Sequence, residues 1–108
     1  MSPHAQQTFR ALADPTRREI LMLLRGGELT IAQVAGNFDM TRAAVKKHLT
    51  ALSDGGLIHM RARGREKVNS LDPAGLTPVL DWLSAFDAFW DARLENLKTA
   101  LEEDLSND

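Results

Sequence analysis

The sequence has 108 residues, of which 44% are hydrophobic and 26% charged, and its formal net charge at pH 7 is −2. This length suits a single domain, and the composition is that of an ordinary globular protein. The absence of Cys excludes disulfides, thiolate metal sites and thiol redox switches. No apolar run approaches the roughly 18 residues of a membrane-spanning helix, and no signal-peptide-like N-terminus is visible, so we expect a cytoplasmic protein with no membrane partner.

The charges are distributed unevenly along the chain. Residues 40–71 carry seven cations against two carboxylates, whereas residues 72–108 carry two cations against nine carboxylates. A basic segment within an acidic chain indicates a local site for a polyanion. Charge alone leaves a second interpretation open, in which both segments are simply solvated faces of opposite sign.

Four helices are predicted in the first half of the chain from apolar spacing and capping residues. The first is expected over residues 4–13. Asp14 and Pro15 then break it and begin a second helix, as its N-cap and first residue, and this helix ends at a Gly-Gly pair. Thr30 and Thr41 are each predicted to cap a further helix.

The pattern changes after the fourth helix. Residues 57–62 and 66–71 are the predicted strands of a hairpin with Gly64 at its tip. Residues 79–105 are predicted to form one long helix, because their apolar side chains recur every 3.5 to 4 residues, roughly. Two short helices joined by a tight turn and followed by a hairpin predict a mainly α fold, the winged helix-turn-helix.

Several motifs follow one another in a specific order: LADPTRREIL, ELTIAQVAG, the run T-x-x-x-V-x-K-H-L-x-x-L and a closing GGLI. In this order and spacing the sequence resembles the ArsR/SmtB-type bacterial transcriptional regulators. The resemblance implies one domain that binds double-stranded operator DNA as a homodimeric repressor. It also implies that residues 15–71 form the DNA-binding core and wing, and that the helices near 4–13 and 79–105 form the dimer.

The helix after Thr41 carries the candidate DNA contacts. Its apolar stripe of Val45, Leu49 and Leu52 is predicted to face the core. Cations near the start of a helix oppose the helix dipole, and they are explained if that end meets a polyanion. The predicted DNA-binding residues on this helix and its cap are Thr41, Arg42, Ala43, Lys46, Lys47 and Thr50.

Each of these residue types suits a particular contact with DNA. The small side chain of Ala43 permits close approach to base edges in the major groove. Lys47 is predicted to donate to guanine, while Arg42 and Lys46 are expected to meet a base or a phosphate. Thr41 and the free amides near the helix start are expected to meet a phosphate.

The hairpin tip supplies a second group of cations. Arg63 and Arg65 flank Gly64 and are predicted to reach phosphates or a narrow minor groove, as the wing of the fold. Arg61 and Lys67 are weaker candidates for the same role. The alternative is that these charges only protect strand edges from aggregation.

The dimer contacts are predicted to come from apolar side chains on the first and last helices. The aromatic cluster of the last helix has an alternative role, in which it lines a pocket for a small apolar effector. We prefer dimer packing, because a small chain could not otherwise cover these side chains. The predicted interface residues are Phe9, Leu12, Trp82, Phe86, Phe89, Trp90 and Leu97.

No cofactor and no metal are expected. Thr30 and Ala32 stand where metal-sensing relatives often carry a Cys-x-Cys pair, and the last helix contains no His. A carboxylate site formed by Asp87, Asp91 and Glu95 is conceivable for a hard cation, but a solvated helix face is preferred.

No catalytic motif indicates an enzyme, and His48 is expected to pack or form hydrogen bonds rather than to act as a base. A winged-helix protein-interaction module without DNA binding is the alternative from another class. A repressor that responds to a small apolar effector is a further alternative, and the sequence does not identify the effector.

Overall fold

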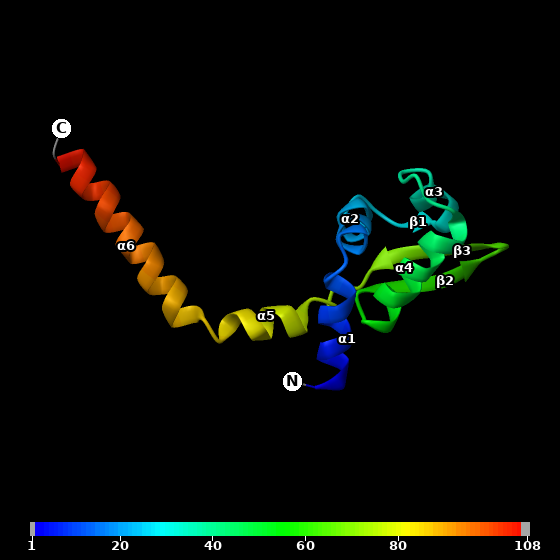
Figure 1. Cartoon of the computed structure of the whole chain (residues 1–108), viewed down its shortest axis with the longest axis horizontal. Helices are drawn as coiled ribbons and strands as arrows, with labels where there is room; N and C mark the ends of the chain where they lie inside the picture. The colour runs from blue at the N-terminus through cyan, green and yellow to red at the C-terminus, as the bar shows by residue number, and fades with distance from the viewer. Residues whose placement is uncertain (1, 107–108) are drawn as a thin grey trace.

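The computed structural model describes residues 2–106 and confirms a mainly helical fold with a small sheet (Figure 1). The first helices and the hairpin fall where the sequence predicts them. The elements in chain order are α1 (Pro3–Leu12), α2 (Pro15–Leu24), β1 (Leu29–Thr30), α3 (Ile31–Ala35), α4 (Arg42–Asp54), β2 (Ile58–Arg63), β3 (Glu66–Leu71), α5 (Thr77–Ser84) and α6 (Asp87–Ser106).

The predicted capping residues begin the helices as expected. The side chains of Asp14, Thr30 and Thr41 each accept a hydrogen bond from the backbone amide three residues further on, at 3.1 Å in all three cases. At α3 the cap is reciprocal, because the Gln33 side chain also accepts from the Thr30 amide at 2.9 Å. These bonds satisfy amides that would otherwise lack partners at the helix starts, and they set where α2, α3 and α4 begin.

The hairpin of β2 and β3 is confirmed, but it belongs to a three-stranded antiparallel sheet of order β1-β3-β2. The sequence analysis did not predict β1, which has two residues and pairs Leu29 with Asn69 and Thr30 with Val68. The Asn69 side chain reinforces this pairing, since its Nδ2 donates to the Leu29 carbonyl at 3.2 Å. The wing is therefore attached to the segment that leads into α3.

A single buried cluster joins the helices to the base of the hairpin. The predicted stripe of α4, made of Val45, Leu49 and Leu52, is fully buried at the centre of this cluster. Both α1 and α2 pack against α4. This packing fixes the orientation of α4 and turns its opposite face to solvent. The other buried hydrophobic residues of the cluster are Ala11, Ile20, Leu24, Val34, Leu57 and Ile58.

The prediction of one continuous helix over residues 79–105 is wrong, although a long C-terminal helix is present as α6. The chain turns at Ala85 and Phe86, between α5 and α6. The Ser84 hydroxyl donates to the Asp81 carbonyl at 2.7 Å, and the Ala85 amide donates to Trp82, three residues back. The α-helical pattern, in which each amide bonds to the carbonyl four residues back, thus gives way to bonds that span three residues, and α5 ends. The Ser84 hydroxyl contributes because it competes for a backbone carbonyl.

α5 and α6 extend from the body as an arm (Figure 1). The Cα radius of gyration is 19.1 Å, whereas about 13 Å is typical of a compact chain of this length. The arm leaves a row of large apolar side chains exposed, with exposed fractions between 39% and 77%. On α5 and α6 these are Leu80, Trp82, Leu83, Phe86, Phe89, Trp90, Leu94, Leu97, Leu101 and Leu105. Within residues 2–106, no helix has the length and apolarity to cross a membrane.

Candidate nucleic-acid interface

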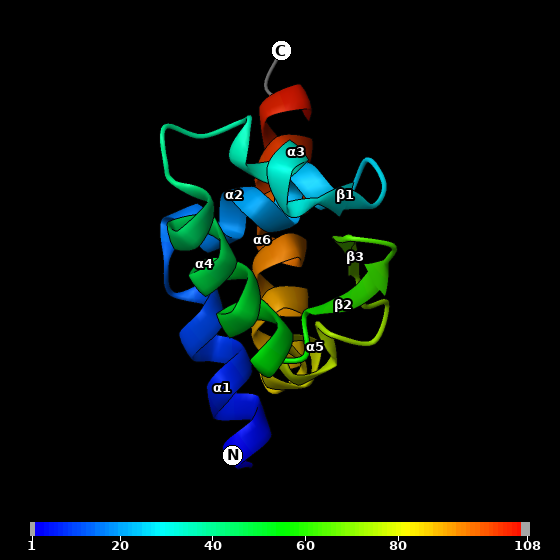
Figure 2. The ribbon, with the colours of Figure 1, turned by 90° about the vertical axis from the view of Figure 1, so that its right-hand side faces the viewer.

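α4 presents one polar face to solvent, on the side opposite its buried stripe. Figure 2 views the molecule from this side, with α3, α4 and the hairpin in front and α6 behind. The candidate DNA contacts on this helix and its cap are exposed, as the sequence predicts. They are Thr41, Arg42, Ala43, Lys46, Lys47 and Thr50.

A cleft of ≈ 410 Å³ separates the start of α4 from the wing. The start of α3 forms its third side. The cleft collects residues that lie far apart in the sequence, and most of the charged side chains among them are cationic. The lining residues are Thr30, Ile31, Ala32, Arg42, Ala43, Lys46, Arg65, Glu66 and Lys67.

The electrostatics of the cleft favour an anion. Arg42 and Lys46 face it from α4, while Arg65 and Lys67 face it from the wing, and Glu66 is the one carboxylate in the lining. Cations converging on a concave surface focus a positive potential and raise the local concentration of a polyanion. Arg42 and Lys46 thus lie where both the dipole of α4 and the other cations of the cleft disfavour positive charge.

Lys47 and Thr50 lie on the outer side of α4 rather than in the cleft. Both are exposed and follow Ala43 along the helix at spacings of four and seven residues, which places the three side chains in one row. α4 therefore offers two adjacent rows: one beside the cleft, with Arg42 and Lys46, and an outer one that begins at Ala43 in the cleft lining and continues outside the cleft. The Thr41 hydroxyl accepts a hydrogen bond from the Ala44 amide, which leaves its own O–H and the free amides at the start of the helix available to a phosphate.

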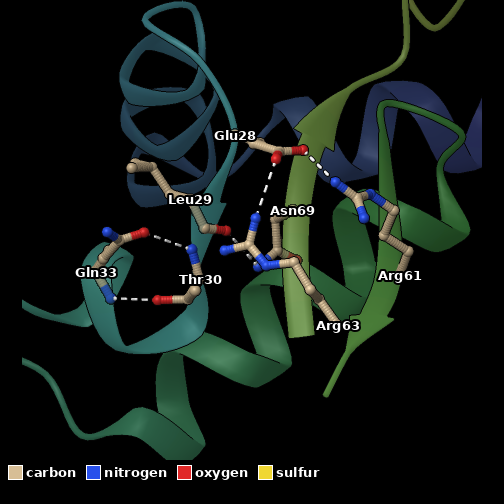
Figure 3. Close-up of polar contacts among 7 residues, drawn as sticks. All are labelled: Glu28, Leu29, Thr30, Gln33, Arg61, Arg63 and Asn69. Carbon is tan, nitrogen blue, oxygen red and sulfur yellow. Dashed lines mark hydrogen bonds and ion pairs between the residues drawn. The ribbon is translucent and has the colours of Figure 1, made fainter. Parts of the chain in front are cut away.

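Neither of the two arginines of β2 lines the cleft. Both share one carboxylate, that of Glu28 (Figure 3). Arg61 Nη2 donates to Glu28 Oε2 at 2.7 Å, and Arg63 Nη1 donates to Glu28 Oε1 at 3.3 Å. The structure thus separates Arg63 from Arg65, which the sequence analysis had grouped together. It also brings Lys67, a weaker candidate from the sequence, into the cleft.

Glu28 was missed by the sequence analysis. Its partners lie 33 and 35 residues further along the chain. No local spacing rule connects positions that far apart. The contact could have been predicted only if the pairing of β1 with the wing had been predicted first.

α2 supports α4 on the side away from its exposed polar face. Arg17 Nε donates to His48 Nδ1 at 3.3 Å, and His48 is half-buried, which confirms its predicted hydrogen-bonding role. Asp14 lies nearby at the start of α2. The hydrogen bond from the Arg17 backbone amide is the main cause that lowers the pKa of the Asp14 carboxyl below its ordinary value.

The predicted dimer residues lie mostly on the arm. Phe9 on α1 and Trp82 form an edge-to-face pair with 6.0 Å between ring centroids, and Trp82 and Phe86 form another at 5.1 Å. Phe89 and Trp90 pack edge-to-face on α6 at 5.2 Å, and Leu97 is exposed further along it. Leu12 differs from the others, because it is half-buried against the core cluster of its own chain.

Among residues 2–106, no group of three or more His, Asp or Glu side chains is arranged to hold a metal ion. The carboxylates of Asp87, Asp91 and Glu95 lie on α6, within the exposed arm. The structure thus offers no second element that would complete a cation site around them within the described part of the chain.

The arrangement of α3, α4 and the wing defines a winged helix-turn-helix DNA-binding domain, and comparison with known proteins identifies its family. The profile described as "Bacterial regulatory protein, arsR family" matches residues 14–59. The chain is 33% identical to the transcriptional repressor SdpR of Bacillus subtilis over 78 residues, which is 72% of this chain and 87% of SdpR. It is 36% identical over 88 residues to the HTH-type transcriptional regulator Rv2034 of Mycobacterium tuberculosis, covering 82% of this chain and 79% of that protein.

Solved structures agree with the sequence comparisons. The crystal structure of the ArsR family transcriptional regulator RHA00566 superposes with a TM-score of 0.75 at 34% identity, covering 84% of this chain and 95% of that chain. An ArsR-like transcriptional regulator from Rhodococcus sp. RHA1 gives a TM-score of 0.68 at 33% identity, covering 89% and 91%. The protein belongs to the ArsR family of bacterial transcriptional regulators.

Proposed function

We propose that this protein is a homodimeric transcriptional repressor that binds a palindromic operator and does not sense a metal. The observation that carries the proposal is the basic cleft between α4 and the wing, in which four cations converge with one carboxylate. Such a cleft matches the charge of a DNA backbone passing between the recognition helix and the wing.

α4 is proposed to enter the major groove. Its outer row then reads bases: Lys47 donates to guanine O6 or N7, Thr50 contacts a neighbouring base, and Ala43 permits the close approach. Arg42 and Lys46, which flank the cleft, contact phosphates or the adjacent base edge. The amides at the start of α4, beyond Thr41, are oriented toward a phosphate in the same way as other helix N-termini.

The wing is proposed to contact the backbone beside the groove. Arg65 and Lys67 supply this contact from the cleft. Arg63 is proposed as a further, weaker contact, because its guanidinium is shared with Glu28. The side chain of Arg63 is still 54% exposed, so a phosphate can reach it.

The dimer is proposed to form through the arm and α1. A chain of this size cannot cover the apolar row of α5 and α6 by itself, and exposed apolar surface of this extent is typical of an interface. The same face on two copies gives a two-fold axis. Two recognition helices related by that axis would read major grooves about 34 Å apart, and the bound dimer would block access of RNA polymerase to the promoter.

A second candidate function is a response to a small apolar effector. A hollow of ≈ 430 Å³ lies between α2 and the connection from β3 to α5. This volume lies in the range of small-molecule sites. The aromatic cluster of the arm is a less suitable location for an effector. The hollow next to it, of ≈ 440 Å³ between α1 and α5, is lined by Trp82 but by none of the other aromatic side chains of the cluster. Most residues lining the first hollow are apolar: Leu12, Leu21, Met22, Leu57, Leu71, Pro73 and Leu76, with Arg18, Arg25 and Asp72 also lining it.

Fluorescence anisotropy with the DNA upstream of the protein's own gene and with a scrambled duplex, across a salt series, tests the main proposal. Tight, selective binding with a steep salt dependence is expected for a repressor of its own promoter. A genome-wide selection with the purified protein covers operators located elsewhere. If neither experiment yields selective binding, the proposal is wrong and a protein-interaction module is the better explanation. Thermal-shift screening of small apolar compounds tests the effector candidate separately.

A further inference from the structure

Glu28 connects two parts of the molecule that the proposed function uses together. It lies in the segment before β1, which leads into the helix-turn-helix, and its carboxylate bridges Arg61 and Arg63 on the wing (Figure 3). Each guanidinium takes a different oxygen of the carboxylate, at 2.7 and 3.3 Å. One carboxylate is therefore shared between two guanidinium groups and offsets part of their combined positive charge.

The backbone that carries Glu28 is held in place on its C-terminal side. Leu29 pairs with β3 and accepts a hydrogen bond from the buried side chain of Asn69, 3.2 Å away. Thr30 is fixed by the reciprocal cap with Gln33 (Figure 3). The carboxylate is thus presented to β2 from an ordered position rather than from a free loop.

The pairing is accessible to competition. The side chains of Arg61, Arg63 and Glu28 are 53%, 54% and 41% exposed. Water and salt screen ion pairs at such exposures strongly, so a phosphate that approaches the wing can displace the carboxylate. Glu28 therefore weakens the attraction of β2 for DNA without abolishing it.

We propose that Glu28 limits the sequence-independent affinity of the wing for DNA, because its carboxylate competes with phosphates for Arg61 and Arg63. This inference rests on the proposed function. Phosphate contacts contribute equally to every sequence, whereas base contacts of α4 contribute only to the operator. Weakening two contacts of the first group lowers the affinity for operator and for scrambled DNA by the same factor and leaves the base contacts intact. The two cleft cations of the wing, Arg65 and Lys67, remain available to orient it.

The test compares wild type with Glu28→Gln, which keeps the shape of the side chain and removes its charge. Release of one or two arginines to phosphates steepens the slope of log affinity against log salt by about 0.9 to 1.8 on a scrambled duplex. At the larger value, a fourfold rise in salt costs the variant roughly twelvefold more non-specific affinity than it costs wild type. At low salt the affinities for the operator and for the scrambled duplex are expected to rise by the same factor, so their ratio stays unchanged.

Two further variants isolate the cause. Glu19→Gln removes an exposed carboxylate of α2 and changes the net charge equally, so it controls for the global field and is expected to leave the slope unchanged. Adding Arg61→Met and Arg63→Met to Glu28→Gln is expected to make the salt dependence as shallow as that of wild type, or shallower.

Three outcomes overturn the inference. The first is an unchanged slope in Glu28→Gln, and the second is an equal effect of Glu19→Gln. The third is a loss of affinity for both duplexes with a lower melting temperature, which would make Glu28 a purely structural residue. Failure of the proposed function gives a different result, because Arg42→Gln and Lys46→Gln would then leave binding to both duplexes unchanged.

Discussion

The carboxylate of Asp14 accepts a hydrogen bond from the backbone amide of Arg17, 3.1 Å away, and the Arg17 side chain in turn donates to His48 on α4. One residue of α2 therefore joins the start of its own helix to the recognition helix. The cap is electrostatic as well as geometric, because an ionised carboxylate accepts more strongly than a protonated one. This gives the stability of the fold a dependence on pH.

The pKa of the Asp14 carboxyl is lower in the folded chain than its ordinary value of 3.8, mainly because of the Arg17 amide. The unfolded chain binds this proton more tightly, so the cap stabilises the fold above pH 3.8 and loses this effect as pH falls through the lower folded pKa. Asp14→Asn keeps a capping side chain without the titration. We expect the difference in melting temperature between wild type and Asp14→Asn to shrink below pH 3.8, and a difference independent of pH would contradict this.

Lys47→Ala tests whether the outer row of α4 reads bases. Loss of a specific contact to guanine is expected to weaken operator binding by about 1–3 kcal/mol and to change binding to a scrambled duplex much less. Competition anisotropy at fixed salt measures both affinities. Lys98→Ala, on α6, removes the same charge from the arm and serves as the control. Unchanged operator affinity in Lys47→Ala would mean that α4 enters the groove in another orientation.

Arg65→Ala tests the wing. Because Arg65 faces the cleft, its loss is expected to weaken binding to operator and scrambled DNA alike and to flatten the salt slope by about 0.9. Arg63→Ala is expected to have a smaller effect in the same direction, since Glu28 already offsets part of that charge. Equal slopes for Arg65→Ala and wild type would remove the wing from the proposed interface.

Thr30→Ala tests the reciprocal cap of α3. The substitution removes the acceptor for the Gln33 amide and is expected to destabilise the fold by about 1–2 kcal/mol in urea denaturation. Thr30→Ser retains the hydroxyl and is the matched variant. If both variants unfold at the same urea concentration, lost packing of the methyl group accounts for the effect and the cap does not.

Leu97→Glu tests dimerisation through α6. Burial of a leucine contributes about 1.5–3 kcal/mol, and a symmetric dimer loses two such contacts, so the dissociation constant is expected to rise roughly 100-fold or more. Sedimentation equilibrium measures it. Asn96→Glu adds the same charge one position earlier on the helix. A dimer of unchanged affinity in Leu97→Glu would exclude this face of α6 from the interface.

The sequence predicted the parts of the fold that depend on local patterns. The stripe of Val45, Leu49 and Leu52 and the caps Thr30 and Thr41 are visible within a few residues, because helix period and capping chemistry are local. The exposed face of α4 followed from that stripe.

The features that were missed depend on contacts between distant segments, or on a side chain that competes with the backbone for hydrogen bonds. β1 has only two residues, so its alternation carries no signal, and its partner lies some 40 residues away. The bridge from Glu28 to Arg61 and Arg63 could not be predicted without the pairing of β1 with β3, which brings Glu28 next to the wing. The turn after Ser84 contains no Gly or Pro, the usual signals of a helix end, and the apolar spacing continues across it.

The arm also has a consequence for how the amount of protein affects its own fold. In a single chain the apolar side chains of α5 and α6 are in contact with water. In the proposed dimer their burial stabilises the folded chain by mass action, so dilution below the dissociation constant reduces stability and assembly together. A cell holding few copies would therefore contain chains that are more readily unfolded and degraded, and occupancy of the operator would rise more steeply than the copy number.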